Sequence, residues 1–159
     1  MTQSVPSHTG PAALIKLAQD VLNTEIAGLA AVRDRLNART PEKAPLVLAL
    51  GLLAACTGRV VVTSNSGETA ELNAILPALK SLGTSLIAMT GREDSTLGRL
   101  ADVTLHSGVP REACPHGLAP TASTTAVLAL GDALAVCLMQ LKSFTEKDFL
   151  RYHPGGSLG

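Results

Sequence analysis

The hydrophobic and polar positions along the chain predict helices that alternate with short strands. Apolar residues recur at helical spacing over residues 11–36, and a second helix, opening at Pro41, is apolar on every face over 46–56. Such uniform apolarity indicates burial in a core or at a subunit interface. Runs of apolar and β-branched residues predict strands at 59–63, 85–89 and 103–105. Further helices are expected at 68–82, 95–101, 121–142 and 145–152, and Pro77 should kink or divide the first of them.

Strands and helices of these lengths predict an α/β fold with a doubly wound parallel sheet flanked by helices. Ligands of such sheets bind beyond the carboxyl ends of the strands. Residues 1–10 show no periodicity and predict a mobile tail, whereas residues 11–159 predict one domain.

One predicted strand end leads directly into the segment SNSGET at residues 64–69, which precedes a helix. Its hydroxyl groups, its glycine and the helix N-terminus suit a bound anion, and a phosphate is the natural candidate. The spacing matches neither a Walker loop nor the G-x-G-x-x-G pattern of dinucleotide folds. Ordinary helix capping by Ser66 or Thr69 explains the same residues, and one helix start can serve both purposes.

The composition of the chain argues against several kinds of partner and binding site. Lys plus Arg and Asp plus Glu number 13 each, which argues against a nucleic acid or an anionic membrane as the main partner. Three widely spaced cysteines suggest neither a disulfide framework nor a zinc site, and favour a reducing compartment. The start of the sequence lacks the pattern of a signal peptide, and the apolar run 46–56 is shorter than the ~20 residues that span a bilayer. The cytoplasm is therefore expected.

Four ordered motifs resemble the sugar-isomerase (SIS) domain of D-arabinose 5-phosphate isomerases. They are SNSGETAELNAIL at 64–76, LIAMTGR at 86–92, EACP with GLAPT at 112–121, and FT at 144–145 through HPGG at 153–156. The resemblance assigns residues 11–159 to one such domain. It implies that D-ribulose 5-phosphate and D-arabinose 5-phosphate interconvert through an enediol, without cofactor or metal, on the route to the lipopolysaccharide sugar Kdo. The fully apolar second helix and the long first helix exceed what one small sheet needs to cover, so a homo-oligomer is expected, with a tetramer favoured. The resemblance implies that its sites are shared between subunits.

The resemblance also assigns roles to individual residues. Those that would hold the substrate phosphate are Ser64, Asn65, Ser66, Gly67 and Thr69. Those at acid and base positions are Glu71, Glu112 and His153. Taken alone, each of these three has a plainer interpretation. Glu71 would complement the helix dipole, Glu112 would pair with the neighbouring Arg111, and His153 would be an exposed tail residue.

The chain departs from the family between Thr63 and Ser64, which are joined directly. Family members have there at least a βαβ unit, on the order of 30 residues, with a lysine that resembles a catalytic or substrate-orienting group. A natural deletion, an engineered one and an unrecorded segment all fit this gap. The remaining strand is expected to lead into the serine loop and preserve a smaller sheet. Many relatives carry CBS repeats after the isomerase domain, and none is expected within the residues up to Gly159. An alternative function is thus an impaired module that binds or senses a phosphosugar.

Overall fold

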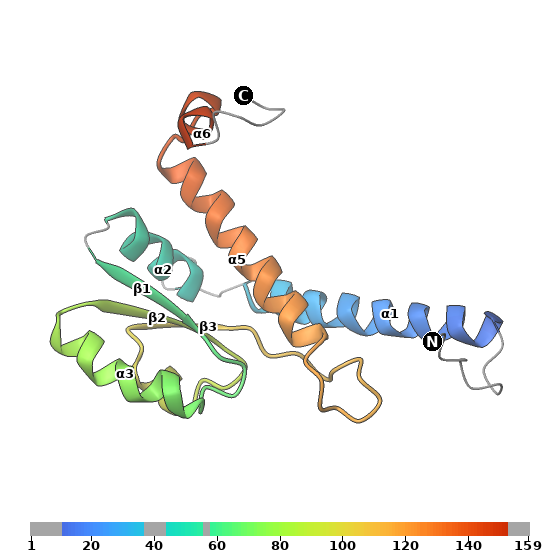
Figure 1. Ribbon diagram of the computed structural model, residues 1–159. Coiled ribbons are helices and arrows are strands. Elements are labelled where there is room, and N and C mark those ends of the chain that lie inside the picture. Colours follow the sequence, from blue (N-terminus) through green and yellow to red (C-terminus); the bar gives the residue numbers. More distant parts are fainter. Residues whose placement is uncertain (1–10, 37–43, 56–57, 153–159) are drawn as a thin grey trace, which may run out of the picture.

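The computed structural model describes residues 11–36, 44–55 and 58–152. Its sheet has three parallel strands in the order β1 (Arg59–Thr63), β2 (Ser85–Thr90), β3 (Val103–His106). Its helices are α1 (Pro11–Arg35), α2 (Pro45–Ala54), α3 (Ala70–Ser81), α4 (Thr96–Leu100), α5 (Ala122–Leu141) and α6 (Glu146–Tyr152). Figure 1 shows α3 on one side of the sheet and α2 and α5 on the other. The predicted α/β fold is confirmed; the predicted tail and His153 lie outside the described residues.

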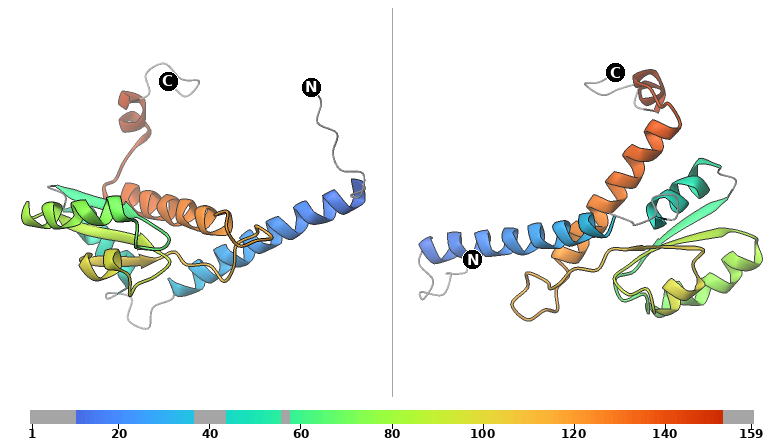
Figure 2. Two further views of the ribbon diagram at one scale, coloured as in Figure 1. Left: turned by 60° about the horizontal axis from the view of Figure 1, so that its bottom comes forward. Right: turned by 180° about the vertical axis from the view of Figure 1, so that it is seen from behind.

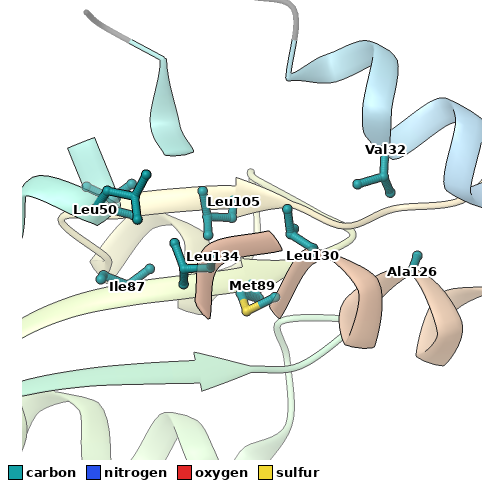
Figure 3. Packing of buried hydrophobic residues seen from close by; sticks show 10 residues of the cluster. Val32, Leu50, Ile87, Met89, Leu105, Ala126, Leu130 and Leu134 are labelled. Carbon is teal, nitrogen blue, oxygen red and sulfur yellow. The ribbon is translucent and has the colours of Figure 1, made fainter. Parts of the chain in front are cut away.

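The central strand β2 divides the core into two clusters because alternate side chains of a strand point to opposite faces. Leu86 and Ala88 pack with residues of α3 and α4, among them Leu76 and Leu97. On the opposite face, Ile87 and Met89 pack against α1, α2 and α5. The labelled residues of this larger cluster in Figure 3 are Val32, Leu50, Ile87, Met89, Leu105, Ala126, Leu130 and Leu134.

Strand β1 takes the place expected after the gap. It pairs with β2 in parallel, Val61 opposite Ile87, and no strand in the described parts of the chain pairs with its other edge. The ladder continues past the end of β1, where the Ser64 N–H donates to the Met89 carbonyl at 3.1 Å. The serine loop, residues 64–69, therefore starts directly at the carboxyl end of the sheet.

The structure differs from the predicted start of the second helix and from a division of α3 at Pro77. The predicted start at Pro41 lies outside the described residues, but Ala44 is extended (ψ 134°) and α2 begins at Pro45, because a residue before proline avoids the helical region. Within the single chain α2 is not covered on every face, since Val47 and Leu48 are 45% and 47% exposed, so burial at a subunit interface stays a prediction for these two residues. Helix α3 runs undivided through Pro77, held against the sheet by the fully buried Leu76.

Helices α1 and α5 form the layer on the larger core cluster. The C-terminal part of α1 packs against α5, while its N-terminal part extends away from the sheet in both views of Figure 2. This extending part exposes Leu17, Leu22 and Ile26. By length and composition α5 could cross a membrane, but a core helix of a globular domain passes the same test. Its Ala126, Leu130 and Leu134 are buried in the core.

Candidate active site

The loops that follow the three strands are fastened to one another at the carboxyl edge of the sheet. The Gly91 N–H donates to the Asn65 carbonyl at 3.0 Å, and the Leu97 N–H donates to the Gly67 carbonyl at 3.1 Å. The Ser107 N–H donates to the Thr90 carbonyl at 2.9 Å. The serine loop is thus held as one unit with the start of α4 and with the loop after β3.

Hydrogen bonds inside the serine loop show whether the side chains of Ser66 or Thr69 cap α3. The Ser64 and Thr69 hydroxyl oxygens lie 2.9 Å apart, and the Gly67 N–H donates to Ser64 Oγ at 3.1 Å. Ser66 Oγ accepts from the Glu68 N–H, before α3 begins. Thr69, the N-cap residue of α3, makes no capping hydrogen bond with its side chain. The first turn of α3 is therefore left uncapped by its N-cap side chain, so capping by Thr69 is not what the structure has, and the anion site stays a prediction.

Glu68 is a member of the motif whose role the sequence did not reveal. Its Oε1 accepts a hydrogen bond from the Thr96 N–H at 2.8 Å, so it ties the serine loop to the first residue of α4. This bond holds the pKa of Glu68 below its ordinary value of 4.5. The sequence gives no sign of this contact, because local spacing does not relate two residues that are 28 positions apart.

We expect Glu68→Gln to lower the thermal unfolding midpoint at neutral pH. A group whose pKa is depressed on folding contributes stability above its unfolded pKa, and this contribution is lost as the pH falls through the folded pKa. The difference between wild type and variant should therefore shrink below pH 4.5. Thermal unfolding followed by circular dichroism across that range tests this, and a difference that is constant with pH would contradict it.

Glu112 caps the start of α5. Its Oε2 accepts from the Thr121 N–H at 2.8 Å, the Thr121 hydroxyl at 3.1 Å and the Ser123 N–H at 3.2 Å. Burial raises the pKa of Glu112, but the donors of Ser123 and Thr121 outweigh it, and the pKa lies below its ordinary value. The predicted ion pair with Arg111 is not among the ion pairs of the described residues; Arg111 instead donates to the Thr24 hydroxyl at 3.1 Å.

Glu112 and the serine loop line one cleft of about 370 Å³, called here the Glu112 cleft. Its lining residues come from all three loops: Asn65, Ser66, Gly91, Arg92, Gly108, Val109, Arg111 and Glu112. A neighbouring hollow of about 430 Å³ shares Asn65 and reaches Ser64 and the first turns of α5. The structure thus brings Asn65 and Ser66 together with Glu112, and Ser64 lines only the neighbouring hollow. Thr69 and the exposed Glu71 line neither space.

Helix α1 fixes the loop that carries Glu112. Besides the bond from Arg111 to Thr24, the Arg35 guanidinium donates to the Gly108 carbonyl. A Cβ at Gly28 would lie 3.0 Å from Val109 Cγ1, so the glycine allows this close contact. Sequence reasoning missed these contacts. Within the described residues, no group of three or more His, Cys, Asp or Glu side chains could hold a metal ion.

Fold and cleft together define a class of protein: an α/β domain with a loop rich in hydroxyl groups and a carboxylate at the carboxyl ends of parallel strands. The chain belongs to the SIS domain family, whose model matches residues 58–137.

Curated relatives named arabinose 5-phosphate isomerase KdsD align with the chain over 100 residues. Those of Salmonella typhimurium and Escherichia coli K12 are 56% and 55% identical there, over 63% of this chain and 30% of their own length. The chain therefore spans about a third of these relatives. A protein of E. coli CFT073, solved in complex with arabinose 5-phosphate, superposes with a TM-score of 0.77 at 29% identity, covering 91% of this chain and 100% of the other. A Listeria monocytogenes structure described as a putative sugar-phosphate isomerase (TM-score 0.80, 24% identity, 92% and 99% covered) supports the fold.

Proposed function

We propose that this chain is an aldose–ketose isomerase that interconverts D-ribulose 5-phosphate and D-arabinose 5-phosphate. The observation that carries the proposal is that Glu112 lines the same cleft as Asn65 and Ser66 of the serine loop. A phosphate held by that loop would lie at one end of a space that also contains a carboxylate. The names of the curated relatives and the arabinose 5-phosphate complex of the E. coli CFT073 protein supply the substrate.

The phosphate is assigned to the serine loop and the N-terminus of α3. The hydroxyls of Ser64 and Thr69 lie 2.9 Å apart at this helix start; one donates to the other, and the accepting hydroxyl can turn its own proton toward a phosphate oxygen. The helix dipole adds attraction for the negative charge. Asn65 and Ser66 line the cleft beside this site, and the left-handed Gly67 gives the loop its turn.

The proton transfer is assigned to Glu112. Starting from the aldose, the base takes the proton from C2, the C–H electron pair forms the C1=C2 bond, and the carbonyl electrons move to O1, which is protonated. The enediol then loses its O2 proton, C1 takes up a proton, and the carbonyl forms at C2. No net electrons enter or leave, so the reaction requires no redox cofactor. With Oε2 engaged at the start of α5, Oε1 is the oxygen assigned to this work.

A second candidate function is that of a module that binds a phosphosugar without converting it. The observation in its favour is that neither the Glu112 cleft nor the neighbouring hollow has a lysine among its lining residues. The resemblance implies a lysine in the missing segment. Binding requires only the serine loop and α3, whereas conversion requires stabilisation of the enediolate as well.

The two functions are separated by measuring isomerisation and binding on the same preparation. We expect conversion of D-arabinose 5-phosphate to the ketose, and a rise in the unfolding midpoint with the same ligand. Conversion that disappears in Glu112→Ala excludes a contaminating isomerase. A ligand-dependent rise without conversion would select the binding module. Neither conversion nor a shift, in a chain that unfolds cooperatively, would contradict both functions.

We further place this chain in the cytoplasm as a homo-oligomer, with a tetramer as the preferred state. The apolar residues that support an oligomer are Leu22 and Ile26 on α1 and Val47 and Leu48 on α2, all of them exposed. Surfaces of this kind are commonly covered by a partner subunit. Sedimentation of the chain as a monomer would contradict the assembly.

A further inference from the structure

Two arginines, Arg92 and Arg111, are among the residues that line the Glu112 cleft. Their surroundings differ. Arg92 Nε lies 3.5 Å from the carboxylate of Asp94, which offsets part of its charge. Within the part of the chain that the structure describes, no carboxylate lies at ion-pair distance from Arg111.

Arg111 is instead held by an uncharged group from another element. Its Nη2 donates to Thr24 Oγ1 at 3.1 Å, and Thr24 is a buried residue of α1. The Thr24 hydroxyl in turn donates to the Asp20 carbonyl at 2.9 Å, which fixes its orientation. A guanidinium has five N–H donors, so one bond to a threonine leaves most of them available. The geometry orients Arg111 and keeps its positive charge.

The neighbouring carboxylate does not neutralise this charge either. Glu112 directs Oε2 toward the Thr121 and Ser123 N–H groups at the start of α5, and it makes no ion pair with Arg111 within the described residues. The same cleft therefore presents an ionised carboxylate and an oriented cation from consecutive residues. An enolisation requires this combination: a base for the carbon-bound proton and a donor for the oxygen that becomes negative.

We propose that Arg111 is a substrate-binding residue that donates hydrogen bonds to the O1 and O2 end of the sugar and stabilises the enediolate there. This rests on the proposed function and deepens it, because it assigns the electrophilic role to a residue that the chain retains. The phosphate stays on the serine loop, and Thr24 acts as a positioning residue for the guanidinium. Arg111 accordingly distinguishes a phosphosugar from free phosphate.

The experiment compares two ligands on the folded chain. We expect Arg111→Gln to weaken binding of D-arabinose 5-phosphate by roughly tenfold or more, since hydrogen bonds to charged groups are the strong ones. Binding of inorganic phosphate, measured by the same calorimetric titration, should change by less than about twofold, because the serine loop is untouched. Where turnover is measured, kcat should also fall. Arg33→Gln is the matched control, since Arg33 is an exposed arginine of α1 that bonds to Asp34 away from the cleft.

Two further variants separate substrate binding from a role in holding the loop to α1. Arg111→Lys keeps the charge but loses the fork of donors, and its affinity for the sugar phosphate should lie between wild type and Arg111→Gln. Thr24→Val removes the bond to α1 but keeps the guanidinium, and it should lose less affinity than Arg111→Gln. Equal losses in Thr24→Val and Arg111→Gln would overturn the proposal. If Arg111→Gln does not fold, an unchanged affinity in Arg111→Lys would overturn it.

The outcomes also separate this inference from the proposed function. Wild-type affinity for D-arabinose 5-phosphate in Arg111→Gln would overturn the role of Arg111 and leave the isomerase proposal standing. An equal loss for inorganic phosphate would likewise overturn it, because the arginine would then act on the phosphate or on the fold. A wild-type chain that binds inorganic phosphate but shows no preference for the sugar phosphate would overturn both.

Discussion

Replacing Glu112 with glutamine is expected to lower kcat for the isomerisation by about a hundredfold or more, the usual contribution of a positioned general base. The fold should persist. A glutamine carbonyl oxygen can still accept from the Thr121 and Ser123 N–H groups, so the start of α5 keeps its cap and loses only the charge. Steady-state kinetics with the unfolding midpoint of the same samples would show whether activity is lost without loss of structure.

Glu71→Gln is the control for this prediction, because Glu71 is an exposed glutamate that lines neither the cleft nor the neighbouring hollow. It should retain most of the wild-type kcat. The reverse result, with Glu71→Gln inactive and Glu112→Gln active, would move the base to α3.

The pH profile gives a second check of the role of Glu112. The pKa of Glu112 lies below 4.5, so the carboxylate is ionised from there upward and its acid limb in kcat/KM should lie below pH 4.5.

The local parts of this fold could be predicted because short-range patterns determine them. The run Val60-Val61-Val62 predicted β1, and the segment around Gly67 predicted a loop that leads into α3. Ser95 lies at the start of α4 as expected, and its hydroxyl accepts from the Gly98 N–H. Ser95 acts here as the N-cap residue, one position before α4 begins, and in each case the residues that determine the structure lie within a few positions of one another.

The parts that failed depend on residues far apart in the sequence. Thr24 and Arg111 are 87 positions apart, and neither periodicity nor spacing indicates that they meet. Glu112 read alone suggested an ion pair with its neighbour, whereas its partners at α5 lie nine and eleven positions away. The family resemblance named Glu112 but not its bonds. Side-chain identity therefore indicated the chemistry, and packing of α1 and α5 determined which groups share the cleft.

Gly67→Ala is expected to be the most destabilising change in the serine loop. Gly67 has φ +64°, and a Cβ there would lie 1.9 Å from Ser95 Oγ and 2.5 Å from Ser95 Cβ. The left-handed backbone costs an alanine about 1–2 kcal/mol, and forcing Ser95 aside adds about 1–3 kcal/mol. Ser95 also caps α4, so its displacement removes that cap. Urea unfolding would measure the loss, and phosphate titration of the folded fraction would measure the effect on the loop.

Gly83→Ala separates the two causes. Gly83 has nearly the same backbone angle, φ +70°, but an added Cβ would meet nothing within 4 Å. It follows α3 at a point remote from the cleft, so its alanine variant should lose only the backbone cost of about 1–2 kcal/mol and keep its affinity for phosphate. The difference in stability loss between the two variants then measures the cost of the contact between the added Cβ and Ser95 at the start of α4. Equal losses of stability would mean that Ser95 moves freely, and the loop would not depend on that contact.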